Sequence, residues 1–242
     1  MFTIPQLENI LFIDIETAPV VAAYADLPER MQPLWDRKAR TKYRHEPDSE
    51  DPAALFPQKA GIHAEFGRVV CISCGYLQFD EQRQPSLTTK SYYGEEEHQI
   101  LAECGKMLDK YQGARKGRNL CAHNGKEFDF PYLGRRYLIH GIAIPKFLQI
   151  QGQKPWEVAL LDTMELWKFG DYKAYTSLEL MAAVLGVPSS KSDIDGSQVG
   201  RVFWEDKDYE RIKVYCERDV WVTAQVLLRM SRLPGLPEPT EA

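Results

Sequence analysis

The sequence predicts a mixed α/β domain in which a central sheet is flanked by helices. A short apolar stretch near the N-terminus, residues 10–17, is typical of a buried strand. Two further apolar runs, 68–79 and 87–93, are separated by a polar turn at 80–85 and indicate a hairpin. Amphipathic helical segments then alternate with one more short strand, at 119–124. This order of elements around an N-terminal strand indicates a mixed sheet with helices packed on it.

The helices follow from apolar periodicity and capping residues. Residues 95–111 place apolar side chains on one side, and residues 128–140 end at Gly141, a fitting C-cap. The rest of the chain is expected to contain a short strand beginning near 160, a helix with an N-cap at 176–177 that ends near 185, a loop at 191–200, a long helix at 206–232 and a frayed, proline-rich tail at 233–242.

Length and composition fit one globular domain, expected at residues 1–232. The 242 residues are 44% hydrophobic and 27% charged, which supplies enough apolar material for a single core. The net charge of −5 argues against a generally basic nucleic-acid coat but is compatible with a local basic groove. The sequence shows neither a signal peptide nor a membrane-spanning stretch, so we expect a cytoplasmic protein without a membrane partner.

Residues 19–65 are polar and dotted with prolines, and they are too long for an ordinary connection. We expect an elaborated insertion or a mobile flap. Within it, the run 35–44 is basic and contains Trp35 and Tyr43. One interpretation is that the run follows a phosphate backbone while Trp35 or Tyr43 stacks a base. The other is a solvated helix face whose charge is diluted by neighbouring acids.

The five cysteines are scattered, and Cys71-x-x-Cys74 lies inside an apolar, strand-like run. A zinc or redox role would need a second Cys/His pair or a helix N-terminus at this place, and the sequence offers neither. We therefore expect packed thiols.

The N-terminal strand carries two carboxylates. Asp14 and Glu16 alternate with Ile13 and Ile15, so the two acids share one face of the strand. Neighbouring carboxylates repel, and a buried strand tolerates such a pair only with a cation or a proton between them. A strand end that frays into solvent is the alternative. The choice depends on whether other acids converge on the same place.

Two later segments carry acids at informative positions. Asp129 follows Asn124 and Phe128 where a strand gives way to a helix, a place that also suits an ordinary N-cap. Tyr215 and Asp219 are spaced i, i+4 and therefore share one helix face, where a simple hydrogen bond between them is the alternative. Each segment has a structural explanation when it is considered alone.

Taken together, the three segments resemble the DEDD 3′-5′ exonuclease superfamily in its tyrosine-bearing branch. The motifs are D-x-E at Asp14 and Glu16, H-N-x-x-x-F-D ending at Asp129, and Y-x-x-x-D at Tyr215 and Asp219. More narrowly, the chain resembles the predicted 3′-5′ exonucleases related to the proofreading domain of family-B DNA polymerases. The resemblance spans nearly the whole chain. It implies a ribonuclease H-like fold, with a five-stranded mixed sheet flanked by helices.

The resemblance also implies an activity and a metal centre. The activity would be metal-dependent removal of nucleoside monophosphates from the 3′ end of nucleic acid, with single-stranded DNA as the expected substrate. Asp14, Glu16, Asp129 and Asp219 would hold two Mg²⁺ or Mn²⁺ ions, cations that prefer oxygen ligands. By resemblance, Asp14 would contact both ions, Glu16 and Asp219 the ion on the nucleophile side, and Asp129 the second ion. Tyr215 would orient the attacking water.

Four further residues are candidates around this centre. Asn124 and Phe128 would line the site beside the terminal nucleotide, although Phe128 also fits a core position. Asp162 is a weaker candidate that fits a structural cap equally well. Lys191 is a candidate phosphate contact that fits a solvated loop lysine better.

Two rival functions stay open, a non-catalytic nucleic-acid-binding or scaffold module on the same fold and a ribonuclease H-like endonuclease. The choice between DNA and RNA depends on contacts to the sugar 2′-OH, which the sequence does not locate. The sequence does not indicate a protein partner.

Overall fold

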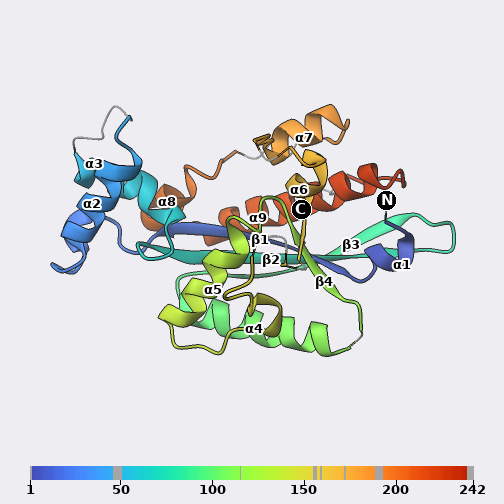
Figure 1. Ribbon diagram of the computed structural model, residues 1–242, viewed down its shortest axis with the longest axis horizontal. Coiled ribbons are helices and arrows are strands. Elements are labelled where there is room, and N and C mark those ends of the chain that lie inside the picture. Colours follow the sequence, from blue (N-terminus) through green and yellow to red (C-terminus); the bar gives the residue numbers. More distant parts are fainter. Residues whose placement is uncertain are drawn as a thin grey trace.

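The computed structural model describes residues 2–45, 51–114, 116–154, 157–158, 160–171, 173–188 and 193–238. Its centre is a five-stranded sheet with the strand order β3-β2-β1-β4-β5 (Figure 1). Strand β2 runs antiparallel to both β1 and β3, whereas β4 is parallel to β1 and β5 is parallel to β4. The sheet is therefore mixed, and its order and directions are those of the expected ribonuclease H-like fold.

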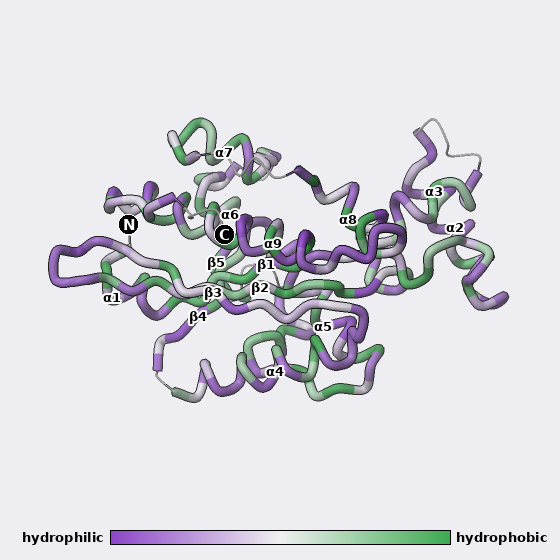
Figure 2. Tube along the Cα trace, turned by 180° about the vertical axis from the view of Figure 1, so that it is seen from behind, coloured by the Kyte–Doolittle hydropathy of each residue, from purple (hydrophilic) through white to green (hydrophobic). Residues whose placement is uncertain are grey.

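The strands are Ile10–Pro19 (β1), Gly67–Phe79 (β2), Pro85–Tyr93 (β3), Asn119–Ala122 (β4) and Leu161–Asp162 (β5). The predicted hairpin is confirmed, because β2 and β3 are paired from Cys71 opposite Tyr93 to Phe79 opposite Pro85. Its turn is hydrophilic and projects away from the helices (Figure 2). Strand β1 lies in the middle of the sheet, where apolar residues on both of its faces can be covered by helices.

Helices cover both faces of the sheet, with α4 and α5 on one side and α6, α7 and α9 on the other (Figure 1). The helical elements are α1 (Ile4–Leu7), η1 (Tyr24–Asp26), α2 (Gln32–Lys42), α3 (Pro52–Lys59), η2 (Ala60–Ile62), α4 (Glu97–Ala114), α5 (Asp129–Ile139), η3 (Lys146–Leu148), α6 (Thr163–Lys168), α7 (Leu178–Val184), α8 (Val199–Arg201), η4 (Val202–Asp206) and α9 (Tyr209–Met230). The last helix begins later than predicted because Asp208 caps it, accepting a hydrogen bond from the backbone N–H of Arg211 at 3.1 Å.

Each face of the sheet has its own apolar cluster. On the side of α4 and α5, β1 contributes Leu11, Ile13 and Ile15. On the side of α9, the same strand contributes Ile10 and Phe12. The alternation of a central strand thus divides the core into two layers, and helices close both.

The segment between β1 and β2 has a small apolar cluster of its own. Trp35, Ala39 and Tyr43 are buried, and their i, i+4, i+8 spacing gives α2 one apolar face. The Trp35 indole donates to the Pro52 carbonyl at 2.7 Å, and the Tyr43 hydroxyl lies 2.7 Å from His63 Nε2. The hypothesis that Trp35 or Tyr43 stacks a base is therefore wrong, because both rings are core. Arginines of the same helix point to solvent, as the alternative expected.

The C-terminal end differs from the prediction in two details. The described part of the tail that was expected to be frayed from residue 233 is packed, because Leu236 is buried and its backbone N–H and C=O both pair with the Gln225 side chain at 3.0 Å. Residues 239–242 lie outside the described part of the chain. The sequence positions of Val214, Val222 and Leu227 suggest that the last helix packs on the sheet through these residues. Val222 and Leu227 are buried, whereas Val214 is 51% exposed.

The five cysteines are free and buried, which confirms the expected packed thiols. Among the helices described, none combines the length and the apolar character needed to span a membrane.

Candidate active site

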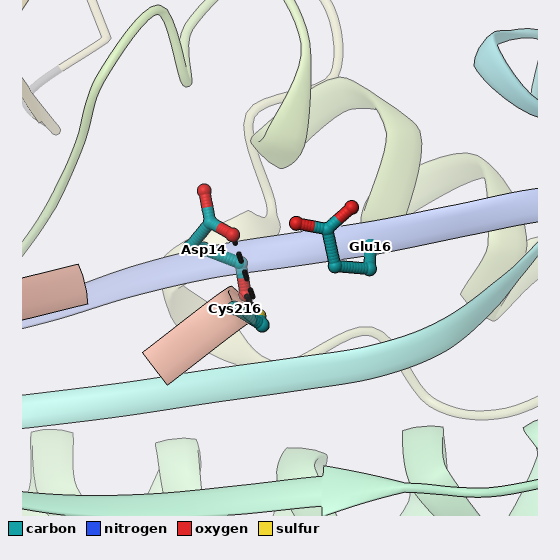
Figure 3. A group of neighbouring side chains, drawn as sticks. All are labelled: Asp14, Glu16 and Cys216. Atoms are coloured by element: carbon teal, nitrogen blue, oxygen red, sulfur yellow. Dashed lines mark hydrogen bonds between the residues drawn. The ribbon is translucent and has the colours of Figure 1, made fainter. Parts of the chain in front are cut away.

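Asp14 and Glu16 lie on β1 where the side facing α9 changes from apolar to acidic. Ile10 and Phe12 of this side are buried in the apolar cluster below α9, and the next two positions are the carboxylates. Glu16 is buried and Asp14 is partly buried. Figure 3 shows both side chains projecting from the same side of the strand. The two acids therefore share one strand face, as the alternation predicts.

Helix α9 crosses this part of β1 and supplies the next groups. The Cys216 thiol donates to Asp14 Oδ2 at 3.3 Å and lies 3.4 Å from the Asp14 carbonyl oxygen (Figure 3). Tyr215 directly precedes Cys216 in the sequence, and its hydroxyl donates a hydrogen bond to the Asp219 carboxylate. The hydrogen bond considered as an alternative for this pair is thus present. It coexists with electrostatic coupling of Tyr215 to Glu16 and Asp14.

Asp129 reaches the same strand from the start of α5. It is the first residue of this helix and is buried, and the N-cap position belongs to Phe128. Its role is therefore not that of an N-cap. The backbone N–H groups of Asp129 itself and of Ile15 donate to its carboxylate. Because Ile15 lies between the two acids of β1, this contact places Asp129 against the acidic part of the strand.

The four carboxylates perturb one another electrostatically. Burial, followed by the nearby charges of Asp219 and Asp129, raises the pKa of Asp14 well above its usual range. The pKa of Glu16 is also raised, first by burial and then by Asp14. Burial raises the pKa of Asp129 to about 7 and that of Asp219 to about 6. These groups form one acidic cluster, which cannot be fully ionised at neutral pH without a compensating cation.

Asn124 and Phe128 lie on the connection between β4 and α5 that leads to Asp129, and Phe128 lines a cavity together with Glu16. Asn124 has a left-handed backbone with φ of 60°, and its side-chain Oδ1 is buried with no hydrogen-bond partner among the described residues. Phe128 is partly buried and packs against the Tyr132 ring, with 5.3 Å between centroids. A buried acceptor without a partner is uncommon in a folded protein, which makes Asn124 an unusual position on this connection.

Asp162 has a structural role. Its carboxylate caps α6 by accepting from the backbone N–H of Met164 at 2.9 Å. It also accepts from the backbone N–H groups of Asn124 at 3.0 Å and Lys126 at 3.1 Å. These contacts hold the β4–α5 connection in place and favour the cap reading that the sequence left open. Lys191 lies outside the described residues.

A cavity of about 180 Å³ opens beside Glu16. Its walls come from four segments that are distant in sequence: the end of β1, the α3–η2 turn, Phe128 and the loop before α8. The lining residues are Ile15, Glu16, Thr17, Pro19, Pro57, Gln58, Gly61, Ile62, Phe128, Gly196, Ser197 and Gly200. The segment between β1 and β2, predicted as an elaborated insertion or a mobile flap, thus forms one wall beside the acidic cluster.

Sequence analysis missed Cys216, which was grouped with the packed thiols. It is buried, yet it is the side chain that contacts Asp14 most directly from α9. The available signal was its position directly after Tyr215, on the helix turn that carries the Y-x-x-x-D motif. A thiol donor at this place helps to fix the orientation of the Asp14 carboxylate.

The donor set suits a divalent cation. Ligand atoms of Asp14, Glu16 and Cys216 lie within 4.8 Å of one another, and the two β1 carboxylates supply hard oxygens. Burial and then the neighbouring carboxylates raise the pKa values of Asp14 and Glu16, and a bound cation would offset both effects. The residues present therefore fit a metal site of the kind that Mg²⁺ or Mn²⁺ prefers.

The mixed sheet and the acidic motifs on β1, α5 and α9 define a domain of the 3′-5′ exonuclease type. The sequence profile of the family described as "Predicted 3'-5' exonuclease related to the exonuclease domain of PolB" matches residues 61–241, which is most of the chain. The chain belongs to this family. A comparison with the curated proteins finds no match.

Solved structures of similar arrangement include polymerases and nucleases. The family B DNA polymerase of Pyrobaculum calidifontis is 15% identical, with a TM-score of 0.49 over 92% of this chain and 24% of the polymerase. E. coli exonuclease I in complex with a dT13 oligonucleotide is 10% identical, with a TM-score of 0.46 over 92% of this chain and 42% of the exonuclease. This chain therefore spans less than half the length of either protein.

Proposed function

We propose that this domain is a metal-dependent 3′-5′ exonuclease that hydrolyses phosphodiester bonds at the 3′ end of single-stranded nucleic acid and releases nucleoside monophosphates. The observation that carries the proposal is the acidic cluster of Asp14, Glu16, Asp129 and Asp219, which couples β1, α5 and α9 electrostatically. Burying four carboxylates together costs stability, and a fold retains such a cluster where cations are to be held. The family to which the chain belongs has the same activity in its description.

The carboxylates would bind two Mg²⁺ or Mn²⁺ ions. When bound, such ions supply an activated water at neutral pH and neutralise the charge that develops on the departing oxygen. Asp14, which is coupled to all the other acids, is suited to contact both ions. We place Glu16 and Asp219 at the ion on the nucleophile side and Asp129 at the second ion.

Tyr215 acts as a positioning group for the attacking water. Burial and the charges of Glu16 and Asp219 raise the pKa of its hydroxyl, so the group stays protonated throughout the physiological range. A phenol in this state is a poor base. It donates to Asp219 and keeps an oxygen lone pair with which to accept a hydrogen bond from water.

The cavity beside Glu16 is the place for the terminal nucleotide. It is open next to a carboxylate of the cluster and is bordered by the Phe128 ring, on which a base can stack. Asn124 lies on the same connection, and its Oδ1 is buried without a partner among the described residues. A rotation of this side chain on substrate binding would present the oxygen to a sugar hydroxyl or a base amino group. A free 3′ end would therefore enter between the α3–η2 turn and Phe128.

The direct test is degradation of 5′-labelled single strands of DNA and RNA of the same sequence, with Mg²⁺, with Mn²⁺ or with EDTA. We expect a ladder of products that shorten by one nucleotide at a time, only with metal present and not on strands whose 3′ end is blocked by phosphate. Internal cuts on the blocked strand would instead identify an endonuclease. Binding of the strands without any cleavage in either metal would identify a non-catalytic module.

Replacing Tyr215 by phenylalanine is expected to lower the hydrolysis rate roughly ten- to hundredfold, because the water loses its orienting hydroxyl while the carboxylates remain. The melting temperature should change little. Tyr76→Phe is the matched control, since Tyr76 is paired with Leu11 on the α4 side of the sheet, opposite the acidic cluster, and should not affect the rate. A Tyr215→Phe protein with the full wild-type rate would remove Tyr215 from the site.

A further inference from the structure

A second concave surface lies on the face of the sheet opposite the acidic cluster. It is a groove of about 430 Å³ between the last turns of α4 and the strands β1, β2 and β3. Leu11 of its floor shares the β1 face of Ile13 and Ile15, whereas Asp14 and Glu16 point to the α9 side. The groove therefore does not belong to the candidate active site.

The floor of the groove is apolar and regular. Leu11 of β1, Tyr76 of β2 and Thr88 of β3 lie opposite one another and form one row across three strands. Met107 of α4 faces this row from the other wall, and Tyr76 is 37% exposed. Leu11 is buried, so Tyr76 and the partly buried Met107 supply the accessible apolar surface, which gains free energy when a large apolar side chain covers it.

The rim of the groove is positively charged. Lys90, Lys110 and Arg118 line it, and none of its lining residues is acidic, although the chain as a whole carries a net charge of −5. Within the described part of the chain, no ion pair neutralises either lysine. The groove thus has three cations around an apolar floor, which is complementary to an acidic ligand with an apolar side chain.

Arg118 is held in place but not fully paired. Its guanidinium lies 4.0 Å from the centroid of the Tyr111 ring and donates to the Tyr111 carbonyl at 2.9 Å. Its Nε is buried without a hydrogen-bond partner among the described residues. The residue as a whole is only partly buried, so the outer part of the guanidinium at the rim can meet a carboxylate of a ligand.

The groove also adjoins an open sheet edge. Strand β3 is the edge strand of the sheet, and Thr88, Thr89 and Lys90 of this strand are exposed. The unpaired backbone groups of an edge strand accept an extended peptide as an additional strand. Lys90 on this edge disfavours a basic or neutral strand and favours an acidic one.

We propose that this groove docks an extended acidic segment of a partner protein, which adds to the edge of β3 and inserts one large apolar side chain between Tyr76 and Met107. The open backbone edge favours a peptide over nucleic acid, because phosphates and sugars cannot continue a strand ladder. The proposal goes beyond the proposed nuclease activity and does not depend on it. Its role would be to bring the domain to a partner while the acidic cluster on the opposite face stays accessible.

The test uses the full chain and a fluorescein-labelled peptide of aspartate and glutamate residues with a single central phenylalanine. We expect saturable binding by fluorescence anisotropy, together with a shift of the Met107 methyl signal in the NMR spectrum. The double variant Lys90→Ala, Lys110→Ala should weaken binding at least about tenfold. The double variant Lys106→Ala, Lys116→Ala is the matched control, because it removes the same charge from exposed sites outside the groove and should change the affinity less than about twofold.

Peptides with alanine in place of phenylalanine, or with lysine in place of the acids, should bind much more weakly. The proposal is overturned if the labelled peptide does not bind, if both double variants weaken binding equally, or if Met107 does not respond. It is also overturned if a single-stranded oligothymidylate shifts Met107 and the peptide does not, since the groove would then be a nucleic-acid track. None of these readouts requires nuclease activity, so a failed nuclease assay does not bear on them.

Discussion

The Asp14→Asn protein should lose metal-dependent release of nucleotides by at least about a thousandfold, equivalent to ~4 kcal/mol in the barrier. Asparagine keeps the shape of the side chain and removes the charge. Asp14 is coupled to Asp219, Asp129 and Glu16, so its loss affects every other acid of the cluster. The measurement is the initial rate of shortening of a 5′-labelled single strand with saturating Mn²⁺.

A control must distinguish a loss of catalytic activity from a loss of folded protein. The melting temperature of metal-free Asp14→Asn should equal or exceed that of the wild type, because one source of repulsion is gone. Glu81→Gln in the hydrophilic hairpin turn removes the same charge at an exposed position, and it should retain the full rate. An Asp14→Asn protein with more than about a tenth of wild-type activity would contradict the assignment of this residue to the metal centre.

The fold was predictable because its elements carry local signals. The hairpin of β2 and β3, the amphipathic α4 and the long α9 each follow from periodicity within one window of sequence, and the structure places all of them close to the predicted bounds. The acidic pair on β1 was visible for the same reason, since two carboxylates at alternate positions of an otherwise apolar strand are a local anomaly.

The segment between β1 and β2 was less predictable. Its apolar face consists of Trp35, Ala39 and Tyr43, and basic residues occupy the positions between them, so the charge of the run concealed the i, i+4, i+8 spacing. Trp35 and Tyr43 are buried because Pro52 and His63, far along the chain, supply hydrogen-bond partners for their polar atoms. Such partners exist only in the folded chain.

The shape of the candidate site was also difficult to predict, because it depends on contacts between segments that are distant in sequence. The cavity beside Glu16 joins β1, the α3–η2 turn, Phe128 and the loop before α8, and no single window of sequence contains more than one of its walls. Cys216 contacts Asp14 across 202 positions of sequence. Motifs therefore indicate which chemistry a site can carry, whereas the shape of the site depends on tertiary contacts.

The acidic cluster also predicts how stability depends on pH in the metal-free protein. Burial raises the pKa of Asp129 from 3.8 to about 7, so the folded state holds a proton that the unfolded state releases. The contribution of the protonated Asp129 carboxyl to the free energy of unfolding is fully present below about pH 4. This contribution is lost as the pH rises toward 7. Three pKa units correspond to on the order of 4 kcal/mol of unfolding free energy. Asp219, with its pKa raised to about 6, contributes in the same direction.

The effect is measured by urea denaturation in EDTA at about pH 5 and about pH 8, comparing the wild type with Asp129→Asn. Burial lowers the pKa of His63 to about 4, so His63 acts in the opposite direction between about pH 4 and 6.5. His63 acts equally in both proteins, and the difference between them isolates Asp129. Asp129→Asn should be the more stable protein at pH 8, and Mn²⁺ should reverse the order, because the cation stabilises only the ionised cluster. A wild type whose stability at pH 8 is unchanged by Asp129→Asn and by Mn²⁺ would show that the four carboxylates do not form a metal site.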